Sequence, residues 1–110
     1  METRRQWTFI THHAQVLLAI ARDPEMRVRE IAEAVQITER YAYRVLNDLQ
    51  EAGFVGRSRH GRGNRYRINP ELTLGDPVVG EQSLREFLRL INSVEHADVL
   101  GELGPRLRTN

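Results

Sequence analysis

The chain has 110 residues, of which 40% are hydrophobic and 28% charged, as expected of one globular domain with a small core. It contains no cysteine, which excludes disulfide bonds, thiol-based redox sensing and cysteine-ligated metal centres. The longest apolar run, Val16–Ala21, is too short to cross a bilayer and no cleavage site follows it, so we expect a cytoplasmic protein.

Positive charge is concentrated in one short segment, although the net charge of the chain is only +1. Residues 57–70 carry five Arg and no acidic residue, whereas residues 1–56 carry seven Arg against eight acids and residues 71–110 carry four Arg against seven acids. All 16 basic residues are Arg, for which a GC-rich genome is a sufficient explanation. Each guanidinium is nevertheless planar and can bind a phosphate or a guanine edge through two hydrogen bonds.

The N-terminal part is expected to begin with a polar arm, residues 1–6, and an apolar cluster that leans on the core or on a partner chain, formed by Trp7, Phe9 and Ile10. Thr11 can cap the helix that follows. This helix ends at Asp23-Pro24, because proline cannot continue it. Its apolar stripe comprises Ala14, Val16, Leu17, Leu18, Ile20 and Ala21.

Two further helical patterns are separated by a turn of two residues, Gln36-Ile37. The first spans Val28–Val35 and the second spans Glu39–Glu51, with Thr38 as its N-cap and Gly53 as its stop signal. At about 100° per residue, one face of the second pattern is apolar and points to the core, comprising Ala42, Val45, Leu46 and Leu49.

The opposite face of this third helix carries hydrogen-bonding side chains in its N-terminal half, namely Arg40, Tyr43, Arg44 and Asn47. Such side chains suit the edges of bases and the oxygens of phosphates. For the helix considered alone, a solvated surface is the simpler interpretation.

The arginine-rich segment has the alternation of a β-hairpin. Residues 54–59 and 65–69 are the expected strands, and residues 60–64 supply glycines for a mobile tip. Tyr66 and Ile68 are predicted to face inward, and Arg65 and Arg67 outward. Asn69-Pro70 closes the sheet, because proline cannot donate to a ladder.

The C-terminal part is expected to contain an ordered loop or linker up to Gly80 and then one amphipathic helix extending to about Ala97. Ser83 and Glu86 have the spacing of a capping box at its start. Its apolar stripe can pack on the first helix of its own chain or on a second subunit, and comprises Leu84, Phe87, Leu88, Ile91 and Val94.

In its order of helix, helix, short turn, helix and basic hairpin, the chain resembles winged helix-turn-helix proteins. Residues 31–55 look like the DNA-binding core of MarR-like and ArsR-like bacterial transcriptional regulators. The residues that carry this resemblance are Ile31-Ala32, Val35, Ile37-Thr38, Val45-Leu46, Leu49 and Gly53-Phe54-Val55. Trp7–Ala14, Ile37–Arg40 and Asn64–Tyr66 also resemble small actinobacterial regulators of this kind, so that residues 7–70 are covered.

The resemblance implies that the third helix enters the major groove and that the hairpin, or wing, contacts the neighbouring backbone or minor groove. Arg62 would lie at the wing tip, flanked by Arg59 and Arg65. Tyr41 would lie at the flank of the helix. The two Tyr of this helix are bulkier than the small polar residues often found there. Carried over by position, the predicted DNA-binding residues are Thr38, Arg40, Tyr41, Tyr43, Arg44, Asn47, Arg57, Arg59, His60, Arg62, Asn64 and Arg65.

Regulators of this kind usually dimerise through terminal helices, so the resemblance favours pairing of the last helix with a second subunit. The predicted dimerisation residues are Leu84, Phe87, Leu88, Ile91 and Val94. A dimer would place two recognition helices about 34 Å apart, which is one turn of DNA.

We expect no metal, no cofactor and no enzymatic activity. Adjacent His12 and His13 point in different directions on a helix, and His96 and Asp98 are poorly spaced for a shared site. Gly61-Arg62-Gly63 lacks the helix that a phosphate-binding loop requires, and no triad-like motif is present.

The sequence therefore predicts a mainly α fold with a small β-hairpin, in which residues 1–70 form a winged helix-turn-helix DNA-binding domain and residues 71–110 form a linker and a dimerisation helix. The expected function is that of a dimeric, sequence-specific transcriptional repressor with double-stranded DNA as its partner and no membrane partner. Two alternatives stay open. One is a protein-interaction module without specific DNA binding; the other is a regulator that responds to a small-molecule effector bound between the first and last helices, near Trp7, Phe9 and Phe87.

Overall fold

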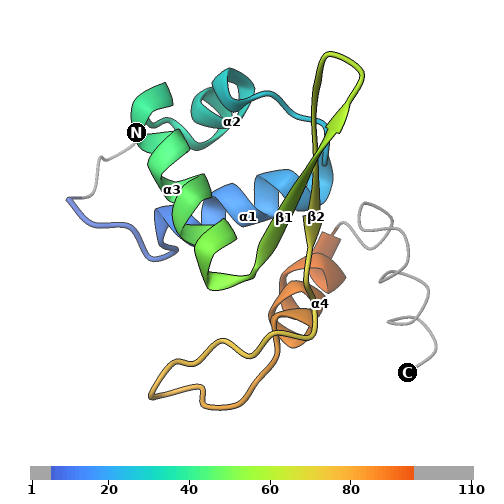
Figure 1. The fold of residues 1–110 in the computed structure, drawn as a ribbon. Helices are drawn as coiled ribbons and strands as arrows, with labels where there is room; N and C mark the ends of the chain where they lie inside the picture. Colours follow the sequence, from blue (N-terminus) through green and yellow to red (C-terminus); the bar gives the residue numbers. More distant parts are fainter. Residues whose placement is uncertain (1–5, 96–110) are drawn as a thin grey trace.

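The computed structural model describes residues 6–95, with side chains described as far as residue 91, and this part of the chain contains four helices and one antiparallel hairpin (Figure 1). The mainly α fold with a small hairpin is therefore confirmed. The expected N-terminal arm, the helix end at Ala97 and the pair His96 and Asp98 lie outside the described residues. The elements are α1 (His12–Arg22), α2 (Val28–Val35), α3 (Glu39–Ala52), β1 (Val55–His60), β2 (Gly63–Ile68) and α4 (Leu84–Glu95).

Local capping sets the ends of α1 and α3. The Thr11 hydroxyl accepts a hydrogen bond from the Ala14 N–H at 3.1 Å, and the Thr38 hydroxyl accepts one from the Tyr41 N–H at 3.0 Å. Each bond satisfies a backbone donor that has no partner inside its helix. Gly53 ends α3 at a φ of 91°, a left-handed conformation that glycine adopts without steric cost.

The core lies where α1, α2 and α3 meet the base of the hairpin. Val16, Ile31 and Val45 are fully buried there, one from each of the three helices, and Val55 and Tyr66 are buried on the strands. All four residues predicted for the inner face of α3 are buried. The helical stripes therefore point as their periodicity indicates, and α3 presents its polar side to solvent.

The tip of the hairpin is tighter than predicted. The strands pair from Val55 opposite Ile68 to His60 opposite Gly63, so the turn contains only Gly61 and Arg62. Gly61 has a φ of 61°, which permits this two-residue turn. His60 and Asn64, which were expected in a mobile tip, are paired strand residues.

Alternation along the paired strands divides the hairpin into two faces. The front face is formed by Val55, Arg57, Arg59, Asn64, Tyr66 and Ile68. The reverse face is formed by Gly56, Ser58, His60, Gly63, Arg65 and Arg67. The predicted inward and outward positions of β2 are thus confirmed, but Arg57 and Arg59 of β1 share the face of Tyr66.

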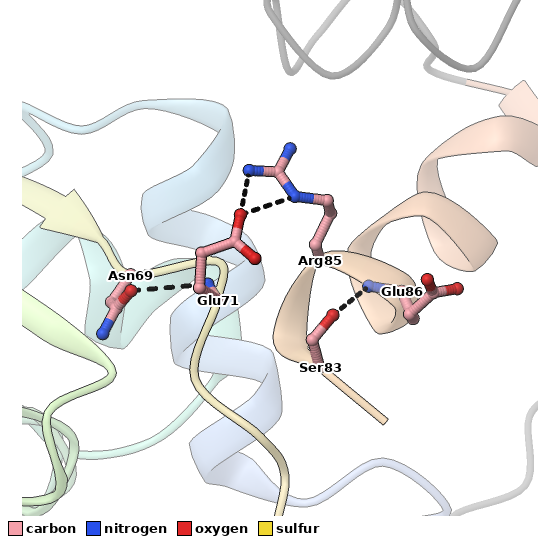
Figure 2. A network of polar contacts seen from close by, with 5 residues as sticks. All are labelled: Asn69, Glu71, Ser83, Arg85 and Glu86. Atoms are coloured by element: carbon pink, nitrogen blue, oxygen red, sulfur yellow. Dashed lines mark hydrogen bonds and ion pairs between the residues drawn. The ribbon is translucent and has the colours of Figure 1, made fainter. Parts of the chain in front are cut away.

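The loop between β2 and α4 is fastened at both ends (Figure 2). Glu71 accepts a hydrogen bond from Arg85 Nε at 3.0 Å, and the Glu71 N–H donates to Asn69 Oδ1. At the start of α4, the Glu86 N–H donates to the Ser83 hydroxyl, as the capping-box spacing predicts. The backbone N–H of Arg85 also donates to the Pro70 carbonyl at 2.8 Å. These contacts hold α4 close to the base of the hairpin.

The apolar stripe of α4 is divided between two environments. Leu84 and Leu88 are only 3% and 2% exposed and belong to the buried cluster of their own chain. They face inward because the ordered loop returns α4 to this core, which is the packing within one chain that the sequence left open. Pairing of α4 with a second subunit stays a prediction. Phe87 and Ile91 are half-buried, and the side chain of Val94 lies outside the described residues.

The N-terminal aromatic residues do not lean on the core as expected. Trp7 is 63% exposed and Phe9 is 78% exposed, whereas Ile10 is half-buried. These residues precede the N-cap of α1, and no periodic element directs their side chains inward.

The burial of Leu88 generates a stability prediction. Leu88→Ala should lower the free energy of unfolding by about 2–4 kcal/mol, because it removes a core side chain and leaves a cavity. Urea unfolding followed by circular dichroism measures this change. Leu90→Ala is the matched control on the same helix: Leu90 is 68% exposed, and a change within about 0.5 kcal/mol is expected at a dilution at which the chain is monomeric. Equal losses for the two variants would contradict the placement of α4.

Candidate nucleic-acid interface

The polar face of α3 is exposed as the sequence predicts. Arg40, Tyr43, Arg44 and Asn47 all lie on the solvent side, and half of the Tyr43 side-chain surface is accessible. Within residues 6–95, neither arginine of this face forms an ion pair with an acidic side chain. Both guanidinium groups therefore keep their donors available for an external acceptor.

Tyr41 is placed differently from the other predicted contacts on α3. Its ring is half-buried and packs edge-to-face on His12 of α1, with the ring centroids 5.5 Å apart and an interplanar angle of 81°. Nearby, His13 Nε2 lies 2.8 Å from Asp48 Oδ2. These two contacts join α3 to α1, so Tyr41 helps to position the helix rather than extend its exposed face.

Thr38 contributes mainly to the local geometry of α3. Its oxygen accepts the Tyr41 N–H, and its own hydroxyl proton can still be donated to an anion. The position at the N-terminus of a 14-residue helix favours negative charge, because the peptide dipoles leave partial positive charge there.

Tyr66 connects the front face of the wing to α3. Burial raises the pKa of the Tyr66 phenol above 10.0, and the neighbouring Arg57 guanidinium partly offsets this effect. The side chains of Arg57 and Asn64 both lower the pKa of this phenol, and the nearby Tyr43 raises it. The front face of the wing and the polar face of α3 therefore form one continuous surface.

The reverse face of the wing has a different electrostatic environment. Arg65 binds Glu25 in the loop between α1 and α2 at 2.7 Å, and His60 Nε2 lies 3.5 Å from the same carboxylate. The Tyr66 N–H donates to the Pro24 carbonyl at 2.9 Å, which holds this loop along the free edge of β2. Arg65 and His60 are consequently directed to the body of their own chain and away from the front face.

The structure thus brings together part of the predicted set. Arg62 occupies the two-residue turn as expected, but Arg59 and Arg65, predicted to flank it together, lie on opposite faces. Glu25 was missed because it lies 40 residues before Arg65 in the sequence, and no local pattern relates the two. The combined surface of front face, tip and α3 comprises Arg40, Tyr43, Arg44, Asn47, Arg57, Arg59, Arg62 and Asn64.

Other kinds of site receive no support from the described part of the chain. Residues 6–95 contain no group of three or more His, Asp or Glu side chains able to hold a metal ion. None of the helices described there combines the length and the apolar character needed to traverse a membrane.

Residues 9–71 match the model of the family described as "Sugar-specific transcriptional regulator TrmB". The matched segment is more than half of the 110 residues and extends from just before α1 to just after β2. No curated protein matches the chain.

The environment of Tyr66 generates a prediction about alkaline pH. Because its folded-state pKa is raised above 10.0, its contribution to stability is present below that pH and is lost as the pH rises through the folded pKa. Tyr66→Phe keeps the buried ring and should reduce the loss of unfolding free energy between about pH 9 and about pH 11, as measured by urea titration. Equal losses of unfolding free energy for wild type and Tyr66→Phe over this range would contradict the assignment to Tyr66.

Proposed function

The chain belongs to the TrmB family of transcriptional regulators, and from this premise we propose that it is a dimeric repressor that binds specific DNA sequences. In this proposal, α3 enters the major groove and the front face of the wing contacts the adjacent phosphate backbone or minor groove. The matched residues are those of the winged helix-turn-helix, so the match supports the DNA-binding part of the molecule in particular. The protein would act in the cytoplasm.

The observation that carries the proposal is the continuity of the exposed α3 face with the front face of the wing. Arg40 and Arg44 on α3, and Arg59 and Arg62 on the wing, have no acidic partner within residues 6–95. Uncompensated guanidinium groups on one surface attract a polyanion and release its counterions on binding. Tyr43 and Asn47 add hydrogen-bonding groups that are able to distinguish base edges.

The wing and α3 would have different roles in DNA binding. Phosphate contacts made by the wing supply affinity that does not depend on sequence, whereas side chains directed at base edges supply specificity. Arg44 lies near the middle of the exposed α3 face and can form two hydrogen bonds with a guanine. Thr38 at the start of α3 would contact a phosphate.

Dimerisation is proposed from the apolar surface that α4 leaves exposed. Leu90 is 68% exposed and Phe87 and Ile91 are half-buried, so one side of the helix remains apolar although Leu84 and Leu88 face the chain's own core. A symmetric pair would present two copies of α3 to successive major grooves. Occupancy of about one turn of DNA is sufficient to exclude another protein from it, so repression needs no further surface.

The rival function is that of a protein-interaction module that uses the same apolar side of α4 and does not bind DNA specifically. The two functions are distinguished by the wing. A module of the rival kind would keep its partner after the loss of front-face arginines, whereas a DNA-binding protein would lose affinity for the duplex.

The front-face assignment predicts how salt affects DNA binding. Arg59→Gln should weaken binding to duplexes of any sequence and lower the slope of log K against log salt by about one, because one phosphate contact is lost. Fluorescence anisotropy with a labelled random-sequence duplex, at several salt concentrations, measures both effects.

Arg65→Gln is the matched control, because it removes the same charge from the same hairpin but on the reverse face, where Glu25 already compensates it. A clearly smaller change in slope is expected for this variant. Equal slopes for the two variants would overturn the division of the wing into two faces, and absence of wild-type binding at low salt would overturn the proposed function.

Dimeric recognition predicts the form of the binding site. Selection of bound duplexes from a random pool should yield an inverted repeat with half-site centres about one helical turn apart. Arg44→Ala should relax the base preference at one position of each half-site, at a cost of about 1–3 kcal/mol for the preferred base, and should leave the spacing unchanged. Recovery of a single half-site would argue against the dimer, and an unchanged base preference would argue against the role of Arg44.

A further inference from the structure

A hollow of about 440 Å³ lies behind the wing, bounded by the C-terminal end of α1, the reverse face of the hairpin and the start of α4. Its apolar lining includes Ile20 of α1 and Leu88 of α4. Its size falls within the range of natural small-molecule sites. The hollow is not lined by the residues predicted for an effector site between the first and last helices, namely Trp7, Phe9 and Phe87.

The charged groups of this hollow differ in whether they are already compensated. Arg65 is paired with Glu25 and Arg85 is paired with Glu71. Arg67 lines the same hollow, and within residues 6–95 it forms no hydrogen bond or ion pair through its side chain. Arg57 also lines the hollow, but its side chain belongs to the front face of the hairpin, beside the Tyr66 phenol. On the reverse face, the hollow therefore contains one guanidinium with unused donors beside an apolar lining.

Space is available directly beside this guanidinium. Arg67 pairs across the hairpin with Gly56, which has no side chain, and Ser58 is the next residue of β1 on the same face. A Cβ built at Gly56 would meet nothing closer than the Arg67 carbonyl at 4.0 Å. An occupant could therefore lie against β1 and receive hydrogen bonds from Arg67 and Ser58.

From these observations we propose that the hollow behind the wing binds a small organic anion, with its anionic group on Arg67 and its apolar body between α1 and α4. The pairing of one free cation with an apolar lining selects this class over neutral sugars and over inorganic anions. A neutral molecule would leave the guanidinium unpaired, and an inorganic anion would leave the apolar lining unfilled.

Occupancy of this site would also bear on the wing. The reverse face that binds the anion and the front face assigned to DNA belong to the same two strands. A ligand between α1, α4 and the hairpin would therefore change the relative stabilities of the orientations that the wing can adopt. This consequence rests on the proposed function. Coupling between the two sites must be reciprocal, so bound DNA would change the ligand affinity by the factor by which ligand changes the DNA affinity.

The test uses two fluorescent probes that share a ring system and differ in charge, 1-anilinonaphthalene-8-sulfonate and the uncharged N-phenyl-1-naphthylamine, titrated with the full chain. Arg67→Gln should weaken binding of the sulfonate roughly tenfold to a hundredfold, the loss expected for a hydrogen bond to a charged group, and should leave the uncharged probe unaffected. Equal affinities of wild type and Arg67→Gln for the sulfonate would overturn the assignment of the anionic group. Arg62→Gln, which removes the same charge at the wing tip, should change neither titration.

A second variant tests the location. Gly56→Val fills the hollow from β1 with a residue that strands favour, and should weaken binding of both probes. Gly63→Val makes the same change on the same face beyond the hollow, where an added Cβ meets nothing within 4 Å, and should weaken neither. Thermal melts verify that the variants fold. If Gly56→Val retains wild-type affinity for both probes, the site lies elsewhere and the proposal fails.

The regulatory step is tested separately. The sulfonate affinity is measured with the chain free and with the chain saturated by its selected duplex, and a change of at least threefold is expected. An unchanged affinity would overturn the coupling. If the chain binds no duplex, the proposed function is overturned. The probe titrations of the chain without DNA still test the anion site in that case.

Discussion

Ala42 and Val45 are fully buried, and this contact of α3 with the core determines the surface on the other side of the helix. An α-helix that buries one face must expose the opposite face, so the packing of these two small side chains brings Tyr43 and Arg44 to solvent. Leu46 and Leu49 continue the buried stripe towards the hairpin. The base of the wing then rests on the same core through Val55 and Tyr66, which aligns the wing with α3.

The helices could be predicted from the sequence because their signals are local. Periodic apolar residues, the capping threonines and Gly53 all act within one or two turns of chain, and α2 has the predicted bounds, Val28–Val35. The environment of individual site residues is not local. The pairing of Arg65 with Glu25 depends on the α1–α2 loop meeting the edge of β2, and the packing of Tyr41 on His12 depends on the crossing of two helices. Neither contact has a sequence signature.

The stripe of α4 shows a second limit of sequence patterns. Periodicity indicates that an apolar face must be covered, but it does not identify the covering surface. The structure divides that face, with Leu84 and Leu88 buried in their own chain and Phe87 and Ile91 half-buried. Similarly, the five arginines of residues 57–70 form one block of charge in the sequence, whereas the two-residue period of the strands separates them into populations with different neighbours.

This separation makes the wing sensitive to changes in chain length as well as in composition. Because side chains alternate strictly along a strand, one residue inserted into β1 directly after Gly56 would transfer every later side chain of that strand to the opposite face. Arg57 and Arg59 would then point behind the wing, with no change in net charge or composition. Homologues that keep the arginines but vary the strand length by a single residue would therefore have lost this surface, whereas a change of two residues would preserve it.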